Sequence, residues 1–195
     1  MRSERSPAVT TGSASADRRR SLFRGADWQV RKLDGTSDLP RVSVLMGACA
    51  DYFEMTSGGP PGSTEAEDFL AAAPPGKTSD AMLKLGVEAI EAADSALVGV
   101  VHVCKDHPEG GVWYIGLLLL HPSARSRGIG RAVVDGLSEL ARSEEAERLM
   151  LSVLDANEAA ARFWRSVGFQ STRALPSVRF GTKDHSRTEF ALSLR

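Results

Sequence analysis

The sequence predicts an α/β fold in which a mixed, mostly antiparallel sheet is flanked by helices. Three observations indicate it: apolar residues at helical spacing in the first third, three successive β-rich runs in the middle, and a strand–helix–strand–helix pattern before the last strands. The chain has 195 residues, of which 42% are hydrophobic and 25% are charged. This length and composition fit one domain with a tail.

The first 26 residues differ from the rest in composition. They carry six Arg residues against Glu4 and Asp17, many small or polar residues, and little apolar periodicity. We therefore expect residues 1–26 to form a disordered basic tail and residues 27–195 to form a single domain. An interaction arm and a targeting segment stay open for the tail, although Pro7 and Gly12 interrupt the amphipathic helix of a transit peptide.

The first third of the domain predicts a strand and two helices. The strand covers residues 28–33, and Asp38, with Pro40 two residues on, marks the start of a helix. Its apolar residues recur at helical spacing: Val42, Leu45, Met46, Cys49, Tyr52 and Phe53. Gly58 ends this helix, and Thr64 with Glu67 predicts a capping box at the start of a second, short helix.

The remainder predicts a meander and then alternating helices and strands. The expected strands cover residues 82–90, 97–103, 112–120, 148–154, 178–180 and 189–194. An amphipathic helix with Ile129, Val133 and Leu137 on its apolar face follows the third of them. A second helix, at residues 157–167, is closed by Gly168.

Composition argues against several classes of protein. The formal net charge of -1 at pH 7 gives no basic field, so nucleic acid is not an expected partner. No apolar run approaches the roughly 18 residues that span a bilayer, and Cys49 and Cys104 are too few for a disulfide framework. We expect a soluble, cytoplasmic protein, and a homodimer stays open. His102, Cys104 and His107 lack a suitably spaced fourth ligand, so we expect no metal.

Residues 117–131 carry most of the functional information. They run from a buried strand through a basic loop into an amphipathic helix. Gly128 and Gly130 let the backbone approach a ligand closely, and the helix start leaves about four N–H groups unpaired at the positive end of the helix dipole. Such a loop binds phosphate, and Arg125, Arg127 and Arg131 add positive charge around it.

This loop is similar to the acetyl-CoA loop of the GNAT N-acetyltransferase superfamily. Arg125, Gly128 and Gly130 match the family pattern R/Q-x-x-G-x-G/A, with the strand before it and the helix after it. The resemblance implies a GNAT fold and acetyl-CoA as the acyl donor.

A second family signature, N-x-x-A-x-x-x-Y-x-x-x-G-F, follows in the family's order and spacing. Asn157, Ala160, Gly168 and Phe169 match it, and Trp164 stands at the tyrosine position. The resemblance covers residues 97–169 well and the N-terminal third only in outline.

The resemblance also implies which residues hold the cofactor. The backbone of Leu118, Leu119 and Leu120 would leave the neighbouring strand and pair with the pantetheine amides. Loop amides would hold the diphosphate, and the residues concerned are Arg125, Ser126, Arg127, Gly128, Ile129, Gly130 and Arg131. Trp164 would lie beside the cofactor. Asn157 would bind the amide arm of the cofactor, or cap its own helix, and the two roles are compatible.

The catalytic groups are less clear than the cofactor site. In the family a glutamate at the positions of Tyr114 or Gly116 often serves as the base, and neither residue is a carboxylate. Strict alternation along the strand places Tyr114, Gly116, Leu118 and Leu120 on one face. Tyr114 is thus the catalytic candidate, as a proton relay through water or as part of the pocket wall. Trp164 cannot replace the family's tyrosine as an acid, which should slow turnover.

The predicted function is N-acetyl transfer from acetyl-CoA to a primary amine of a small molecule or a protein. A different acyl group or an alcohol acceptor is the nearest rival among enzymes. An acyl-CoA-binding module with little or no turnover is the alternative from another class, because the carboxylate and the tyrosine are both missing.

Overall fold

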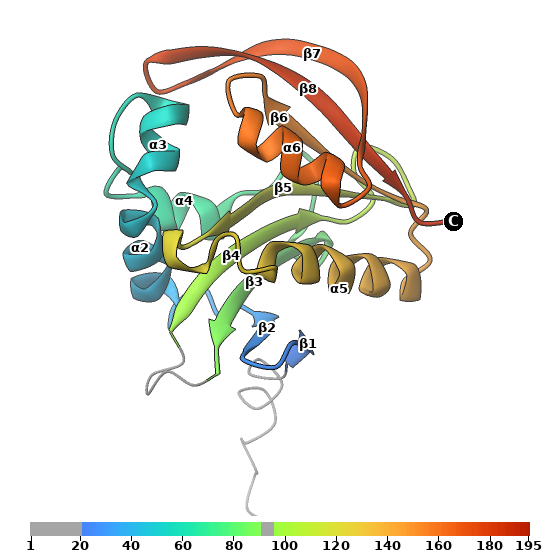
Figure 1. The fold of residues 1–195 in the computed structure, drawn as a ribbon, viewed down its shortest axis with the longest axis horizontal. Helices are drawn as coiled ribbons and strands as arrows, with labels where there is room; N and C mark the ends of the chain where they lie inside the picture. The colour runs from blue at the N-terminus through green and yellow to red at the C-terminus, as the bar shows by residue number, and fades with distance from the viewer. Residues whose placement is uncertain (1–20, 91–95) are drawn as a thin grey trace, which may run out of the picture.

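The computed structural model describes residues 21–90 and 96–195, and a sheet of eight strands forms its centre (Figure 1). The strands lie in the order β1-β2-β3-β4-β5-β6-β8-β7. Neighbouring strands are antiparallel except β5 and β6. Their bounds are β1 Ser21–Arg24, β2 Trp28–Lys32, β3 Met82–Ala89, β4 Leu97–Cys104, β5 Val112–Leu120, β6 Arg148–Leu154, β7 Gln170–Phe180 and β8 Lys183–Ser193. The predicted α/β class with a mixed, mostly antiparallel sheet is confirmed.

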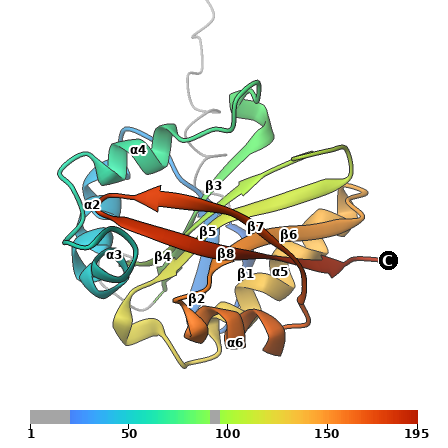
Figure 2. The same cartoon turned by 90° about the horizontal axis from the view of Figure 1, so that it is seen from above.

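Helices cover both faces of this sheet (Figures 1 and 2). They are α2 Leu39–Ala48, α3 Ala50–Ser57, α4 Glu65–Ala71, α5 Ile129–Ser143 and α6 Glu158–Ser166. α5 and α6 pack on one face, where Val101 and Val133 are fully buried. α2, α3 and α4 pack on the other face, around Val100 and Leu45. We call these the C-helix face and the N-helix face.

The predicted tail boundary is wrong for its last residues. Residues 21–24, which we expected to be disordered, form β1 and pair with β2. The apolar Leu22 and Phe23 pack against the core of the C-helix face, and Phe23 lies close against Gly136 of α5. Residues 1–20 lie outside the described part of the chain.

The first predicted helix is in fact two helices. Cys49 leaves the helical conformation and separates α2 from α3, which lets Leu45 and Phe53 reach the same core. Asp38 stands at the N-cap of α2, but its carboxylate makes no cap bond. The capping box predicted for α4 is also absent, because the Thr64 hydroxyl bonds the Asp68 carboxylate at 3.0 Å.

A buried ionic cluster ties β2 and β3 to the start of α2. The Arg31 guanidinium donates two hydrogen bonds of 2.7 Å to Asp38 and one of 2.7 Å to Glu88. Arg41 adds ion pairs of 3.0 Å to Asp38 and 2.8 Å to Glu88. Burial is the largest single influence and would raise the pKa of both carboxyls, but the hydrogen bonds and charges of their neighbours, Arg31 first among them, together outweigh it and lower both values.

The last two strands form a long hairpin instead of the two short strands predicted. β7 is an edge strand with mostly exposed side chains, so it lacks the apolar pattern that marks a strand in sequence. The hairpin arches over the molecule to reach α3 (Figure 1). There the Lys183 ammonium donates to Glu54 O at 2.6 Å, and His185 Nε2 lies 2.7 Å from Thr56 O. The Thr182 amide donates to Ser57 O at 3.1 Å.

Candidate functional site

The sheet opens between β5 and β6. The two strands pair only at Val112, Trp113 and Tyr114. Past Tyr114, β5 continues beside β4 to Leu120 while β6 continues beside β8. We call this opening the β5–β6 split, with its apex at Tyr114. The open edge of β5 has no partner strand in the described part of the chain, so an extended ligand can bind to its backbone as an added strand would.

A bulge in β5 lies at this apex. His102 of β4 is opposite Leu117 while Val103 is opposite Ile115, so Gly116 is an extra residue without a partner on β4. The bulge reverses the alternation of side chains along β5. Ile115 and Leu118 therefore share the C-helix face, and Leu117 joins the N-helix face.

This bulge corrects one prediction about the candidate catalytic residue. Tyr114 is opposite Cys104, on the same face as His102 and Leu117. It does not share a face with Leu118 and Leu120, which pack against the C-helix face. Strict alternation fails here because the bulge adds one residue. A glycine inside an otherwise apolar strand was the sequence signal for it.

The loop after β5 presents an array of free N–H groups. Ser126 and Gly128 both have positive φ values, 59° and 80°, and α5 starts directly after them. Within the described part of the chain, no acceptor receives a backbone N–H from residues 126–131. Six consecutive donors at a helix start are a candidate anion site, of the kind that can hold a diphosphate. A Cβ on Gly128 would meet nothing within 4 Å, so the space above the loop is open.

The arginine side chains of this loop are engaged elsewhere. Arg125 donates to Leu120 O at 2.9 Å and pairs with Asp51 of α3. Arg131 donates to Ser166 O at the end of α6, at 2.6 Å. Arg127 lies on the surface with its guanidinium 3.8 Å from the Asp27 carboxylate. The positive charge that we expected around the loop is thus partly neutralised, and the main-chain amides remain as candidate donors for an anion.

The second signature contributes one polar group and one core residue. Asn157 is the N-cap of α6, and its side-chain oxygen accepts the Ala160 N–H at 3.0 Å. Trp164 is only 7% exposed and packs edge-on against Phe163 and Phe169, with ring centroids 5.0 Å and 5.1 Å away. Trp164 is therefore a core residue of the C-helix face, whereas Asn157 lies at the open end of β6.

His102 is a functional candidate that sequence reasoning missed. The sequence suggested it only as a possible metal ligand. Its Nε2 is buried and has no hydrogen-bond partner in the described part of the chain. Burial, and then the charge of Lys84, lower the pKa of His102 to about 4. The imidazole is therefore neutral at pH 7.

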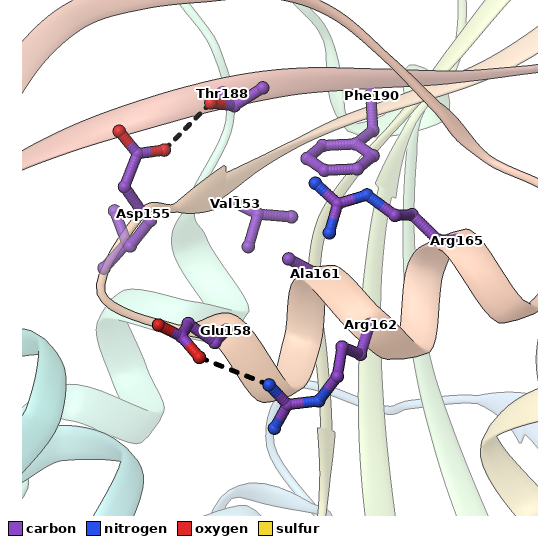
Figure 3. Close-up of a pocket in the computed structure, with 9 residues that line it drawn as sticks. Val153, Asp155, Glu158, Ala161, Arg162, Arg165, Thr188 and Phe190 are labelled. Atoms are coloured by element: carbon purple, nitrogen blue, oxygen red, sulfur yellow. Dashed lines mark hydrogen bonds and ion pairs between the residues drawn. The ribbon is translucent and has the colours of Figure 1, made fainter.

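A separate hollow of about 240 Å³ lies on the other side of α6, between that helix and β8 (Figure 3). Its polar groups already have partners: Thr188 donates to Asp155 at 2.8 Å, and Arg162 pairs with Glu158 at 3.3 Å. Arg165 stacks over the Phe190 ring, 5.4 Å from its centroid. Apart from the Arg165 guanidinium, the polar side chains that line the hollow therefore have partners within the described part of the chain.

Two further properties concern the described residues alone. Residues 21–90 and 96–195 contain no group of three or more His, Cys, Asp or Glu side chains placed to hold a metal ion. In the same residues, no helix combines the length and the apolar character needed to cross a membrane.

The chain matches one family model in sequence and several solved structures in fold. Residues 69–169 match the model of the acetyltransferase (GNAT) family. A comparison with curated proteins finds no match. Among solved structures, a probable acetyltransferase of the GNAT family from Chromobacterium violaceum is similar with a TM-score of 0.71 and 17% identity, over 100% of this chain and 97% of that one.

Two other solved structures have acceptors in their names. Spermidine N-acetyltransferase from Vibrio cholerae, in complex with CoA and spermine, has a TM-score of 0.67 and 15% identity over 87% of this chain and 97% of that one. Ribosomal-protein-S18-alanine N-acetyltransferase from Escherichia coli has a TM-score of 0.62 and 15% identity over 86% of this chain and 94% of that one. At these identities the likeness concerns the fold.

Proposed function

Because the chain belongs to the GNAT family of acetyltransferases, we propose that it transfers an acetyl group from acetyl-CoA to a primary amine. The observation that carries this proposal is the run of six free N–H groups at residues 126–131, placed at the open end of the β5–β6 split. A diphosphate on these amides and a pantetheine arm along β5 make one continuous site. The free thiols Cys49 and Cys104 are consistent with work in the reducing cytoplasm.

Each part of the site has a separate task in this proposal. The loop amides of residues 126–131 bind the diphosphate, and the backbone of residues 118–120 aligns the pantetheine arm. Asn157, whose side-chain oxygen caps α6, offers its amide N–H groups to that arm. Tyr114 at the apex relays the proton of the acceptor amine to water. An alkylamine is only about one part in a thousand neutral at pH 7, so a path for its proton assists the reaction.

The acceptor is an amine of a small molecule or of a protein. The solved structures that share the fold include both kinds, since their names give spermidine in one case and a ribosomal-protein alanine in the other. A test therefore needs both kinds of amine. Release of the CoA thiol, measured with acetyl-CoA against panels of polyamines, amino acids and peptides, identifies the acceptor.

One observation favours a second candidate function, an acyl-CoA-binding module with little or no turnover. The family's tyrosine is replaced by Trp164, which is buried in the core, and neither Tyr114 nor Gly116 is a carboxylate. Calorimetric binding of acetyl-CoA without thiol release on any amine of the panel would favour the module. Absence of binding would contradict both functions.

A further inference from the structure

His102 lies against the bulge at the apex of the split. A Cβ built on Gly116 would come within 3.0 Å of His102 Nδ1, so the imidazole fills the space that a side chain at Gly116 would take. Gly116 itself is exposed, and the positions beside it on the same face are Tyr114 and Leu117. The imidazole of His102, on β4, thus occupies the position at which Gly116 of β5 has no side chain.

A ligand anchored at the loop would bring its reactive end to this point. β5 extends six residues from Tyr114 to Leu120, or about 20 Å at the usual rise per residue. An extended arm with its diphosphate on residues 126–131 runs along this edge toward the apex. Its far end, which carries the thioester, then lies near Gly116.

The protonation state of His102 favours a role as a hydrogen-bond donor over a role as a proton carrier. Lys84 is directly opposite His102 on β3, and its charge disfavours the imidazolium. A proton on Nε2 would be a buried donor without an acceptor, and orphaned N–H groups are rarer in proteins than orphaned acceptors. The favoured tautomer therefore carries its proton on Nδ1, which lies toward Gly116.

We propose that neutral His102 donates its Nδ1–H to the carbonyl oxygen of the bound acyl group and stabilises the negative charge that develops there during transfer. This inference rests on the proposed function. As the acceptor nitrogen forms the C–N bond, the C–S bond breaks, its electron pair leaves with the sulfur, and one proton leaves the nitrogen. His102 keeps its own proton throughout, so its low basicity is no obstacle.

Infrared difference spectroscopy with acetyl-CoA labelled with ¹³C at the carbonyl tests this hydrogen bond directly. We expect the wild-type protein to lower the carbonyl stretching frequency of the bound thioester below that of free acetyl-CoA. His102→Leu should remove the lowering. His102→Asn should keep most of it, because the Asn amide places an N–H near the position of Nδ1.

Turnover should follow the same order. Loss of one such donor lowers kcat by about 10² to 10³, so His102→Leu should lose about that factor and His102→Asn should stay within about tenfold of wild type. An Asn variant as slow as the Leu variant would overturn the donor role, since a proton carrier cannot be replaced by an amide. Nitrogen NMR of the wild-type protein needs no variant, and a proton found on Nε2 would also overturn the inference.

These results separate the inference from the proposed function. If acetyl-CoA binds and His102→Leu leaves both the carbonyl frequency and kcat unchanged, the inference fails while the proposed function stands. If the wild-type protein does not bind acetyl-CoA, the proposed function fails first.

Discussion

A matched pair of variants at Gly128 tests whether the loop holds the diphosphate. Gly128 has φ of 80°, and a Cβ there would meet nothing within 4 Å. Any L-residue at this position therefore adds backbone strain of about 1–2 kcal/mol without a clash. Gly128→Gln and Gly128→Glu have side chains of the same size and differ only in charge. Both should lower the melting temperature of the free protein, by about 2–8 °C for a chain of this length, and Glu somewhat less than Gln because its carboxylate lies at the positive end of the α5 dipole.

Ligand binding then distinguishes the two variants. A ligand at about 100 times its Kd stabilises the folded state by about 2.7 kcal/mol, or roughly 5–11 °C here. We expect acetyl-CoA to raise the melting temperature of the wild type by this amount, to raise that of Gly128→Gln clearly, and to leave Gly128→Glu unchanged because its carboxylate repels the diphosphate. Differential scanning fluorimetry with and without acetyl-CoA measures all six values. Equal shifts for Gln and Glu would refute the assignment of the loop.

Three further predictions concern stability, packing and proton transfer. Because Asp38 and Glu88 have lowered pKa values in the fold, their stabilisation is present above the unfolded pKa values near 4 and is lost as the pH falls through the folded values. Asp38→Asn should lower the free energy of unfolding at pH 7 by about 3–5 kcal/mol and should weaken the loss of stability in acid. Urea titrations from pH 2 to 7 measure both effects, and an acid profile like that of the wild type would contradict the prediction. Trp164→Tyr should destabilise the fold by about 1–3 kcal/mol without raising kcat, because the indole fills core space, and a faster enzyme would show that an acid was limiting. Tyr114→Phe should lower kcat/KM about tenfold with an unchanged melting temperature, and wild-type kcat/KM across pH 6 to 9 would rule out the relay.

The central part of the fold was predictable from sequence because it follows local rules. β5 and β6 have the predicted bounds, since each is a short apolar run between turn residues. Gly168 has φ of 97° after α6, as a left-handed helix end requires. The loop at residues 126–131 was predictable for the same reason, because glycine spacing and a helix start determine its geometry together.

The errors arose where distant residues decide the structure. Asp38 was expected to cap α2, but its carboxylate is drawn to Arg31 and Arg41, which periodicity does not reveal. The arginines near the loop were expected to face the ligand, yet Arg125 is bound by Asp51, 74 residues earlier. The role proposed for His102 depends on a bulge in a neighbouring strand, so no motif in its own segment could indicate it.

The hairpin contact with α3 has a consequence for synthesis on the ribosome. The backbone carbonyls at the C-terminal end of α3, from Glu54 to Ser57, accept hydrogen bonds from Thr182, Lys183 and His185. These donors are made more than 120 residues after the helix itself. While the chain is growing, the Gly58 amide satisfies Glu54 O, but the carbonyls of Thr56 and Ser57 have only water as a partner, so the end of α3 stays unprotected. A nascent chain should therefore become resistant to proteolysis around α3 only after residue 185 has left the exit tunnel.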